Sequence, residues 1–219
     1  MGQYSKSGSY AGYDKTNNER EENDYYATPP KEVTNICEIL KLNFNLDDVI
    51  LDPCCGGMHM LLGIEQYQSG LQLVGNDIIK RPTAQLPDNI KYVECGDCNF
   101  LSNDNHFEAD YIFLNPPFKE IIPFVTKSLQ IAKKSVIMLC RLNFLETQKR
   151  YEQIFKLNPP DDVYIYIDRI ACYKNGDFTI KPNSIESYAW FIWNKTEQSP
   201  PSTSTSTIHW IWSKNHKHN

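Results

Sequence analysis

Four consecutive residues combine backbone rigidity with hydrogen-bond acceptors. Asn115-Pro116-Pro117-Phe118 follows the apolar run 110–114, which is typical of a buried strand and places the four residues at its carboxyl end. Two successive prolines fix two φ angles and remove two amide donors, so the Asn115 side-chain oxygen and a backbone carbonyl oxygen remain as acceptors. An aromatic amine is a poor nucleophile, and accepting both of its hydrogens would aim its lone pair at an electrophilic methyl group. The pattern predicts a rigid clamp for such an amine.

Phe118 adds an aromatic face beside this clamp. An amino group inside a duplex is out of reach of an enzyme, so the base that carries it must be taken out of the stack, and Phe118 would then stack on it. The alternative is an ordinary turn at the end of a strand, because Asn-Pro often starts turns and a phenylalanine often packs in the core.

A glycine turn follows an earlier apolar run. Val49-Ile50-Leu51 leads into Asp52-Pro53 and Gly56-Gly57, and a helical pattern begins soon after. Strand, glycine turn and helix in this order allow the backbone to approach a bound ligand, although a Gly-Gly pair also occurs in plain loops.

Two acidic residues end further candidate strands. Asp77 follows the run 71–74, and Asp97 follows the run 92–93. An acidic side chain after the second strand is suited to accept both hydroxyls of a ribose. Either carboxylate alone is equally typical of a solvated turn or a helix cap.

Short apolar runs alternate with helical patterns through most of the chain, which predicts a doubly wound parallel sheet. Helical patterns occur at 33–40, 121–129 and 144–155, with a further strand at 136–139 between the last two. The segments 163–167 and 188–193 are rich in aromatic and β-branched residues, as late antiparallel strands would be.

These motifs together resemble the phage-type DNA adenine-N6 methyltransferases, which are class I S-adenosylmethionine-dependent amino-methyltransferases with an NPPF motif. The resemblance rests on Asp52-Pro-Cys-Cys-Gly-Gly57, on Asn115-Pro-Pro-Phe118 and on the upstream Asp24-Tyr-Tyr-Ala-Thr-Pro29, and it spans 24–193. It implies a Rossmann-like, mostly parallel seven-stranded sheet with the last strand antiparallel. It also implies S-adenosyl-L-methionine as cofactor and transfer of its methyl group to the N6 amine of adenine in DNA, with base flipping.

The resemblance assigns roles to individual residues. The catalytic residues would be Asn115, Pro116, Pro117 and Phe118. The cofactor would be bound by Tyr26, Thr28, Pro29, Asp52, Cys54, Gly56, Gly57, Asp77, Ile78, Asp97, Cys98, Asn99, Phe100 and Asn115. Met58 departs from the family, which usually has a small residue at this position, so the cofactor loop is expected to take a slightly different path.

Substrate contacts are expected at the clamp, after the fifth strand and in the segment 168–186. The residues concerned are Phe118, Arg141, Phe144, Arg150 and Arg169. Arginines near the active edge suit phosphate contact, although a solvated helix face has the same composition. The segment 168–186 is the candidate for reading base edges.

Composition limits what the protein binds. The 219 residues carry a formal net charge of −5, which argues against general nucleic-acid binding and requires a local basic patch. Seven scattered cysteines suggest free thiols, and Cys95-x-x-Cys98 has no second pair with which to form a metal site, so none is expected. The sequence has no apolar run long enough for a membrane span, and we expect a cytoplasmic protein. The resemblance implies that the cell is bacterial or phage-infected.

The expected organisation is a flexible polar segment (1–23), a methyltransferase domain (24–196), and a Ser/Thr/Pro linker with a short C-terminal segment (197–219) that either docks or stays mobile. The expected partner is DNA, with a monomer or small homo-oligomer as the active form. Methylation of an RNA base amine, methylation of a protein glutamine, and a catalytically silent binding subunit remain alternatives, because one fold hosts many activities.

Overall fold

The computed structural model describes residues 25–81, 90–93 (backbone only at 91–93), 99–102, 107–179, 186–195 and 205–214. The strands are β1 (Tyr26–Ala27), β2 (Val49–Asp52), β3 (Gln72–Asn76), β4 (Ile90–Val93), β5 (Ala109–Leu114), β6 (Ala132–Arg141), β7 (Asp162–Tyr166), β8 (Tyr173–Lys174), β9 (Tyr188–Asn194) and β10 (Thr207–Ile211). The helices are α1 (Pro30–Leu40), α2 (His59–Tyr67), α3 (Ile121–Ile131) and α4 (Gln148–Arg150), with a 3-10 turn η1 (Leu142–Leu145) and a π-helical turn η2 (Tyr151–Phe155).

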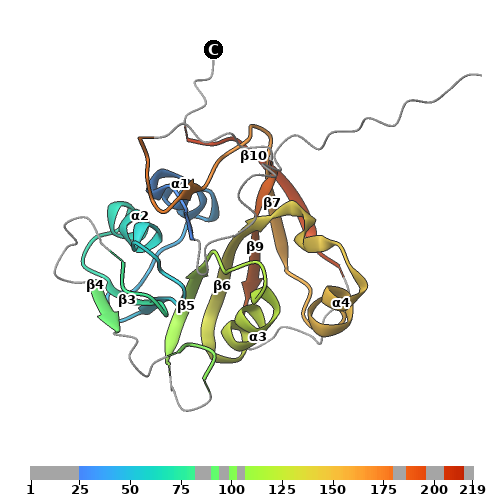
Figure 1. The fold of residues 1–219 in the computed structure, drawn as a ribbon, viewed down its shortest axis with the longest axis horizontal. Coiled ribbons are helices and arrows are strands. Elements are labelled where there is room, and N and C mark those ends of the chain that lie inside the picture. The colour runs from blue at the N-terminus through green and yellow to red at the C-terminus, as the bar shows by residue number, and fades with distance from the viewer. Residues whose placement is uncertain are drawn as a thin grey trace, which may run out of the picture.

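Eight strands form the main sheet in the order β10-β7-β9-β6-β5-β2-β3-β4 (Figure 1). All neighbouring pairs are parallel except those of β9, which runs antiparallel to both β6 and β7. The predicted fold class is confirmed: a mostly parallel, Rossmann-like sheet in which the seventh strand of the core, β9, is antiparallel. The segment 163–167, expected as an antiparallel strand, pairs antiparallel with β9 and therefore runs in the same direction as the rest of the sheet.

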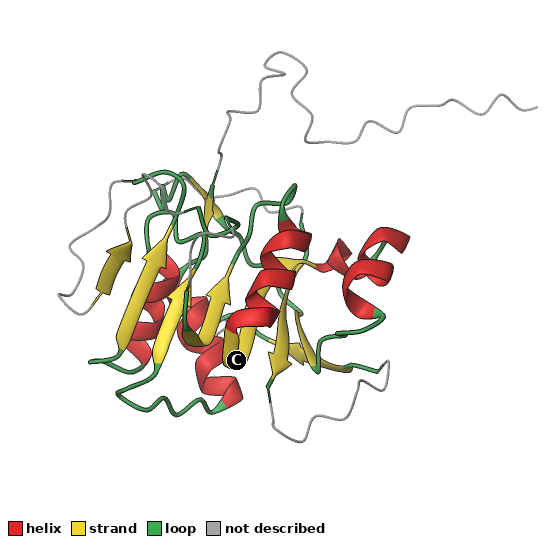
Figure 2. Ribbon diagram, turned by 90° about the horizontal axis from the view of Figure 1, so that it is seen from below, coloured by secondary structure: helices red, strands yellow, loops and turns green. Residues whose placement is uncertain are grey.

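Helices cover both faces of this sheet (Figure 2). Strand β9 shows how one strand serves both layers, since successive side chains point to opposite faces. Its Trp190 packs with α1 and α2 in one apolar cluster, whereas its Phe191 packs with α3 in the other. Burial on both faces explains the continuous apolar runs that define the strands in the sequence.

Helix α1 begins at Pro30, where a missing amide donor costs nothing because the first turn has no internal acceptor for it. Its buried face includes Val33, Ile36 and Cys37, as the spacing predicts. The predicted helix at 144–155 is wrong in its regularity: η1, α4 and η2 replace one continuous helix, and Thr147 between them has a positive φ of 89°.

The C-terminal segment docks onto the sheet. Strand β10 pairs in parallel with β7 along five residues and adds an eighth strand at the edge. Beyond it, Ser213 donates from its backbone amide and its hydroxyl to the Asp168 carboxylate at 2.8 and 2.5 Å, and the Asn35 side chain donates to the Trp212 carbonyl oxygen at 2.8 Å. The segment after the Ser/Thr/Pro linker is thus part of the folded unit.

A second, two-stranded sheet joins distant parts of the chain. Strand β1 pairs antiparallel with β8, so Tyr26 lies opposite Lys174. The Asn175 amide also donates to the Tyr25 carbonyl oxygen at 2.9 Å. This pairing fixes the segment before α1 above the edge of the main sheet. Within the described residues, none of the helices is both long and apolar enough to cross a membrane.

Candidate active site

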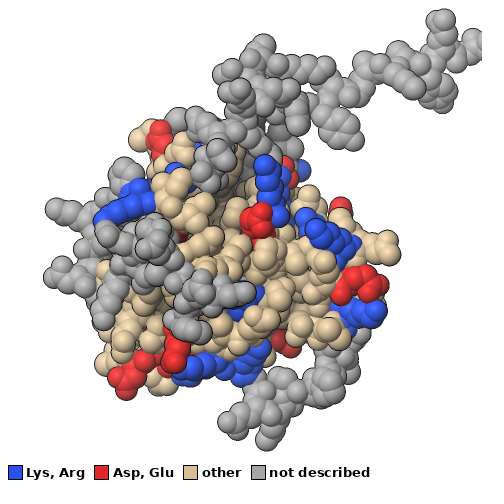
Figure 3. All heavy atoms as spheres, turned by 60° about the horizontal axis from the view of Figure 1, so that its bottom comes forward, with Lys and Arg blue, Asp and Glu red and all other residues tan. Residues whose placement is uncertain are grey.

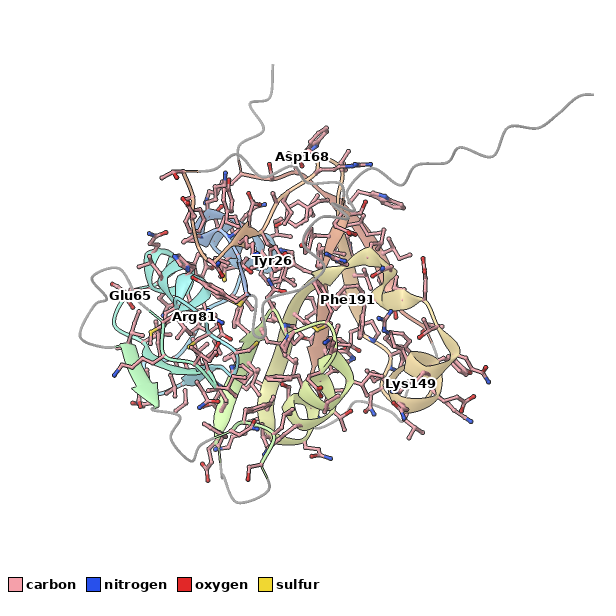
Figure 4. All side chains as sticks on the ribbon, in the orientation of Figure 1. Tyr26, Glu65, Arg81, Lys149, Asp168 and Phe191 are labelled. Atoms are coloured by element: carbon pink, nitrogen blue, oxygen red, sulfur yellow. The ribbon has the colours of Figure 1, made fainter. Side chains whose placement is uncertain are left out.

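The carboxyl ends of β2, β3, β5 and β6 meet at one edge of the sheet, where ligands of open α/β sheets bind. A cavity of about 940 Å³ opens there. Its lining comprises Tyr25, Tyr26, Ala27, Thr28, Asp52, Pro53, Cys54, Cys55, His59, Met60, Asn76, Asp77, Ile78, Arg81, Asn99, Phe100, Leu101, Asn115, Pro116, Pro117, Phe118, Lys119, Glu120, Phe124 and Arg141. Tyr26 and Arg81 mark two of its walls in Figure 4.

Asn115 is oriented by the segment before α1. Its Nδ2 donates to the Tyr26 carbonyl oxygen at 3.1 Å and to the Thr28 hydroxyl at 3.2 Å. Because these protein acceptors engage the amide nitrogen, Oδ1 is left as the acceptor at the cavity. Pro116 follows with no amide donor of its own. The four residues of the motif all line the cavity, as expected from their place after β5.

Cys172 also contacts the Asn115 side chain. Its Sγ lies 3.7 Å from Asn115 Nδ2, and burial raises the pKa of the thiol to about 12. The sulfur therefore stays protonated and neutral at physiological pH, and serves as a weak hydrogen-bonding partner rather than a nucleophile.

The glycine loop is fixed by the end of the neighbouring strand. The Gly56 amide donates to Asp77 Oδ2 at 2.8 Å, and the Cys55 amide donates to the Asn76 carbonyl oxygen at 2.9 Å. Within the loop, the Cys54 amide donates to Asp52 Oδ1 at 3.1 Å. Asp52 and Asp77 are thus both buried at the cavity, one at the end of β2 and one just after β3.

Asp52 is electrostatically unusual. The pKa of its carboxyl group is raised from 3.8 to about 8, chiefly by burial; the hydrogen bond from the Cys54 amide opposes this rise, and the Asp77 charge adds to it. A buried carboxyl group without a cationic partner favours its neutral form, and a positively charged ligand beside it would restore the charge. This end of the cavity is therefore suited to a cationic ligand.

Tyr25 and Arg81 form a wall of the cavity, although no role for either residue was predicted from the sequence. A Cβ atom on Gly56, whose φ is +51°, would lie 2.5 Å from Tyr25 Cδ2, so only glycine lets this ring lie on the loop. The Arg81 guanidinium stacks 4.3 Å above the ring centroid. The two adjacent tyrosines at 25–26 in the upstream motif could have indicated an aromatic wall, but no feature of the sequence indicated Arg81.

The structure shows how Met58, the residue that departs from the family pattern, is accommodated after the glycine pair. It adopts a left-handed conformation, with φ of 62°, immediately before α2. Its side chain is only 4% exposed and belongs to the core beneath α1 and α2. The energetic cost of a positive φ is offset by burial of the thioether chain, so a large residue is accommodated at this position.

Other predicted cofactor residues fall into three groups. Cys54, Ile78, Asn99 and Phe100 line the cavity, with Phe100 buried and stacked on Phe124 at a centroid distance of 5.3 Å. Pro29, Gly56 and Gly57 do not line it; the glycines lie beneath Tyr25 and the His59 ring, and Pro29 caps α1. Asp97 and Cys98, together with Cys95, lie outside the described residues.

The predicted substrate residues are only partly brought together. Phe118 and Arg141 both line the cavity, and the guanidinium lies 4.1 Å from the ring centroid. The expectation for Phe144 is wrong: its side chain is fully buried, in contact with the Phe191 ring, and so cannot stack on a ligand. Arg150 donates to the Asn143 carbonyl oxygen at 2.7 Å outside the cavity lining, and Arg169 is exposed and also outside that lining.

Basic residues do not form a continuous surface on the face shown in Figure 3, where Lys and Arg side chains are interspersed with acidic ones. This agrees with the net charge of −5. The basic side chains that line the cavity are Arg81, Lys119 and Arg141.

Comparison with solved structures places the fold. A candidate class I S-adenosylmethionine-dependent methyltransferase from Listeria monocytogenes matches with a TM-score of 0.58 at 13% identity, over 84% of this chain and 65% of that one. A methyltransferase subunit of a type I restriction-modification system from Streptococcus thermophilus matches with a TM-score of 0.58 at 13% identity, over 91% and 50%. A dimethyladenosine transferase from Plasmodium falciparum matches with a TM-score of 0.50 at 12% identity, over 77% and 62%.

These likenesses define the class: the chain has the fold of the class I methyltransferases. It spans between half and two thirds of the length of these three relatives. No family model matches the sequence, and no curated protein matches it.

Proposed function

We propose that this protein transfers a methyl group from S-adenosyl-L-methionine to the exocyclic N6 amine of adenine in DNA. The observation that carries the proposal is the orientation of Asn115, whose amide nitrogen is committed to Tyr26 and Thr28. Its Oδ1 and the Pro116 carbonyl oxygen are then suited to accept the two hydrogens of one aromatic amine. A nitrogen held in this way needs no strong general base, because the clamp localises its lone pair and the surplus proton passes to water after methylation.

The cavity fits the cofactor at the end away from Phe118. Bound S-adenosylmethionine would supply an electrophilic methyl group on a positively charged sulfur. Asp52, a buried carboxyl group with a raised pKa, suits the cationic ammonium group of its methionine end. Asp77 at the end of β3 suits the ribose hydroxyls, and the fold of the structural relatives supports the same cofactor.

The opposite end of the cavity supports a nucleobase as substrate. Phe118 offers an aromatic face beside Asn115, and Arg141 and Lys119 supply positive charge there. An adenine must leave its duplex to reach this depth, which implies base flipping. The fold shared with a restriction-modification methyltransferase subunit favours DNA over RNA.

Transfer of labelled methyl groups tests the proposal. The substrates are unmethylated duplex DNA, single-stranded DNA and RNA, each digested to nucleosides and analysed by mass. We expect N6-methyladenine in DNA, and a fall of about 100-fold or more in the Asn115→Ala variant, because it loses an oriented acceptor of the reacting group. Label in RNA alone would replace DNA as the substrate, and cofactor binding without transfer to any substrate would indicate a silent subunit.

A further inference from the structure

Three side chains from adjacent strand ends meet at the substrate end of the cavity. Arg141 ends β6, Phe118 follows β5, and Glu186 lies just before β9. The Arg141 guanidinium stacks on the Phe118 ring at 4.1 Å and makes an ion pair with Glu186, with Nη1 3.2 Å from Oε1. We call this group the Arg141 latch.

The latch competes with stacking by a base. A guanidinium group and a nucleobase are both planar and both pack face to face on an aromatic ring, so they exclude one another from one face of Phe118. Arg141 and Phe118 both line the cavity at the clamp. A base that stacks on the face now covered must first displace the guanidinium.

The contacts that hold Arg141 are weak enough to be displaced. The side chains of Arg141 and Glu186 are 25% and 45% exposed, and ion pairs in that range are screened by water and contribute little. Strand β6 holds the backbone of Arg141 opposite Tyr188 of β9, and the Arg141 side chain also hydrogen-bonds to the Tyr188 hydroxyl. Release of the guanidinium therefore needs a change of side-chain rotamer and the loss of this one bond. Once free, it is a planar donor suited to a phosphate oxygen pair.

We propose that Arg141 covers the base-stacking face of Phe118 in the free protein and moves to a DNA phosphate when a flipped adenine enters. Glu186 holds the guanidinium in the covering position until then. This inference rests on the proposed function and extends it: the Arg141 side chain changes partner, from the Phe118 ring to a DNA phosphate. It also gives a net acidic protein one phosphate contact that forms only when the cavity is filled.

The salt dependence of catalysis tests the switch. Methylation of unmethylated genomic DNA is measured as kcat/KM over a series of KCl concentrations for the wild type, Arg141→Gln, Glu186→Gln and the double variant. Because each neutralised phosphate contributes about 0.9 to the slope of log affinity against log salt, Arg141→Gln is expected to reduce the slope by that amount. Glu186→Gln is expected to raise kcat/KM about threefold by freeing the guanidinium, with kcat unchanged.

The double variant separates a latch from simple repulsion. If Glu186 acts by holding Arg141, the gain from Glu186→Gln disappears in the Arg141→Gln background, whereas repulsion between Glu186 and DNA would persist there. Lys133→Gln and Glu108→Gln are matched controls, since this exposed pair, 3.0 Å apart, lies at the opposite end of the sheet. Both controls should leave the slope and kcat/KM unchanged.

Three outcomes overturn the inference. If the wild type methylates DNA but Arg141→Gln keeps the full salt slope, or Glu186→Gln gains equally in both backgrounds, the latch is wrong and the proposed function stands. If the wild type transfers no methyl group to DNA, the proposed function fails and the latch fails with it.

Discussion

Asn115 and Tyr26 are 89 residues apart in the sequence, yet the Asn115 side-chain amide donates to the Tyr26 carbonyl oxygen at 3.1 Å. A main-chain acceptor cannot be changed by substitution, so the orientation of the clamp is built into the pairing of β1 with β8. The Thr28 hydroxyl provides the second acceptor for the same nitrogen and is the part of this arrangement that mutation can reach.

Thr28→Val is expected to lower kcat about fivefold, since loss of one neutral hydrogen bond of about 1 kcal/mol lets the Asn115 amide rotate. Labelled methyl transfer at saturating S-adenosylmethionine measures kcat separately from any change in affinity for the cofactor, which Thr28 is also expected to bind. Thr34→Val is the matched control, because the Thr34 hydroxyl lies outside the cavity lining and donates to the Pro30 carbonyl oxygen, 3.1 Å away. An equal loss of kcat in both variants would argue against a role for Thr28 in orientation.

The Asp52 carboxyl group makes stability depend on pH. Its pKa in the folded protein is about 8, against 3.8 ordinarily, so between about pH 4 and pH 8 the folded state holds a proton that the unfolded state has lost. Stability therefore falls as pH rises through this window. Asp52→Asn removes the ionisable group, and its Tm should exceed that of the wild type by at least about 3 °C at pH 8 while the two converge near pH 4.

The same variant should lose affinity for a cationic cofactor, so that gain of stability and loss of binding occur together. Thermal unfolding of ligand-free protein from pH 4 to pH 8 measures the first effect, and calorimetry at pH 8 the second. Glu146→Gln, which removes an exposed carboxylate outside the cavity lining, serves as control. Parallel Tm curves for wild type and Asp52→Asn would contradict the raised pKa.

The close approach of Tyr25 to the glycine loop predicts a specific defect. Gly56→Ala places a methyl group 2.5 Å from the Tyr25 ring on a backbone with φ of +51°, so the ring or the loop must move. We expect cofactor affinity to fall about tenfold, in line with the cost of overpacking a close contact. Gly70→Ala has a similar backbone strain at φ of +81° but meets only Leu46 Cδ2 at 4.0 Å, so it should lower Tm without affecting cofactor binding.

The residues at strand ends could be predicted from the sequence because a buried strand gives a continuous apolar run. The residue directly after such a run must lie at the carboxyl end of the strand. Asp52, Asp77 and Asn115 all lie where this argument places them. Phe144 misled it, since an apolar residue just after a strand is equally suited to the cavity and to the core, and the contact with Phe191 places it in the core.

Tyr25 and Arg81 could not be predicted in the same way. Their contact depends on the pairing of β1 with β8, which brings together segments about 150 residues apart, and no local periodicity encodes a pairing of two residues per strand. The docking of β10 was left open for a related reason, because a short apolar segment after a Ser/Thr/Pro linker gives no sign of the edge that it will join.

The last prediction concerns the tie between the C-terminal segment and the segment 168–172, which ends beside Asn115. Ser213 holds Asp168, and the chain continues from Asp168 (labelled in Figure 4) to Cys172 beside Asn115. Ser213→Ala removes the hydrogen bond from the hydroxyl to the Asp168 carboxylate. The free energy of unfolding should fall by about 1 kcal/mol, which is less than for a fully buried bond to a charged group, because Asp168 is partly exposed. The larger effect should be local, because opening of one segment costs less than global unfolding.

Hydrogen–deuterium exchange measures this local effect. Amides in the segment 168–176 of Ser213→Ala should exchange several-fold faster than in the wild type, whereas those of β5 and β6 should not change. Ser135→Ala is the control: its hydroxyl donates to the Trp193 carbonyl oxygen at 3.0 Å within the core, so its loss lowers stability without touching the tie. If both variants accelerate exchange in 168–176 equally, the C-terminal segment stabilises the whole fold and does not hold the segment 168–176 in particular.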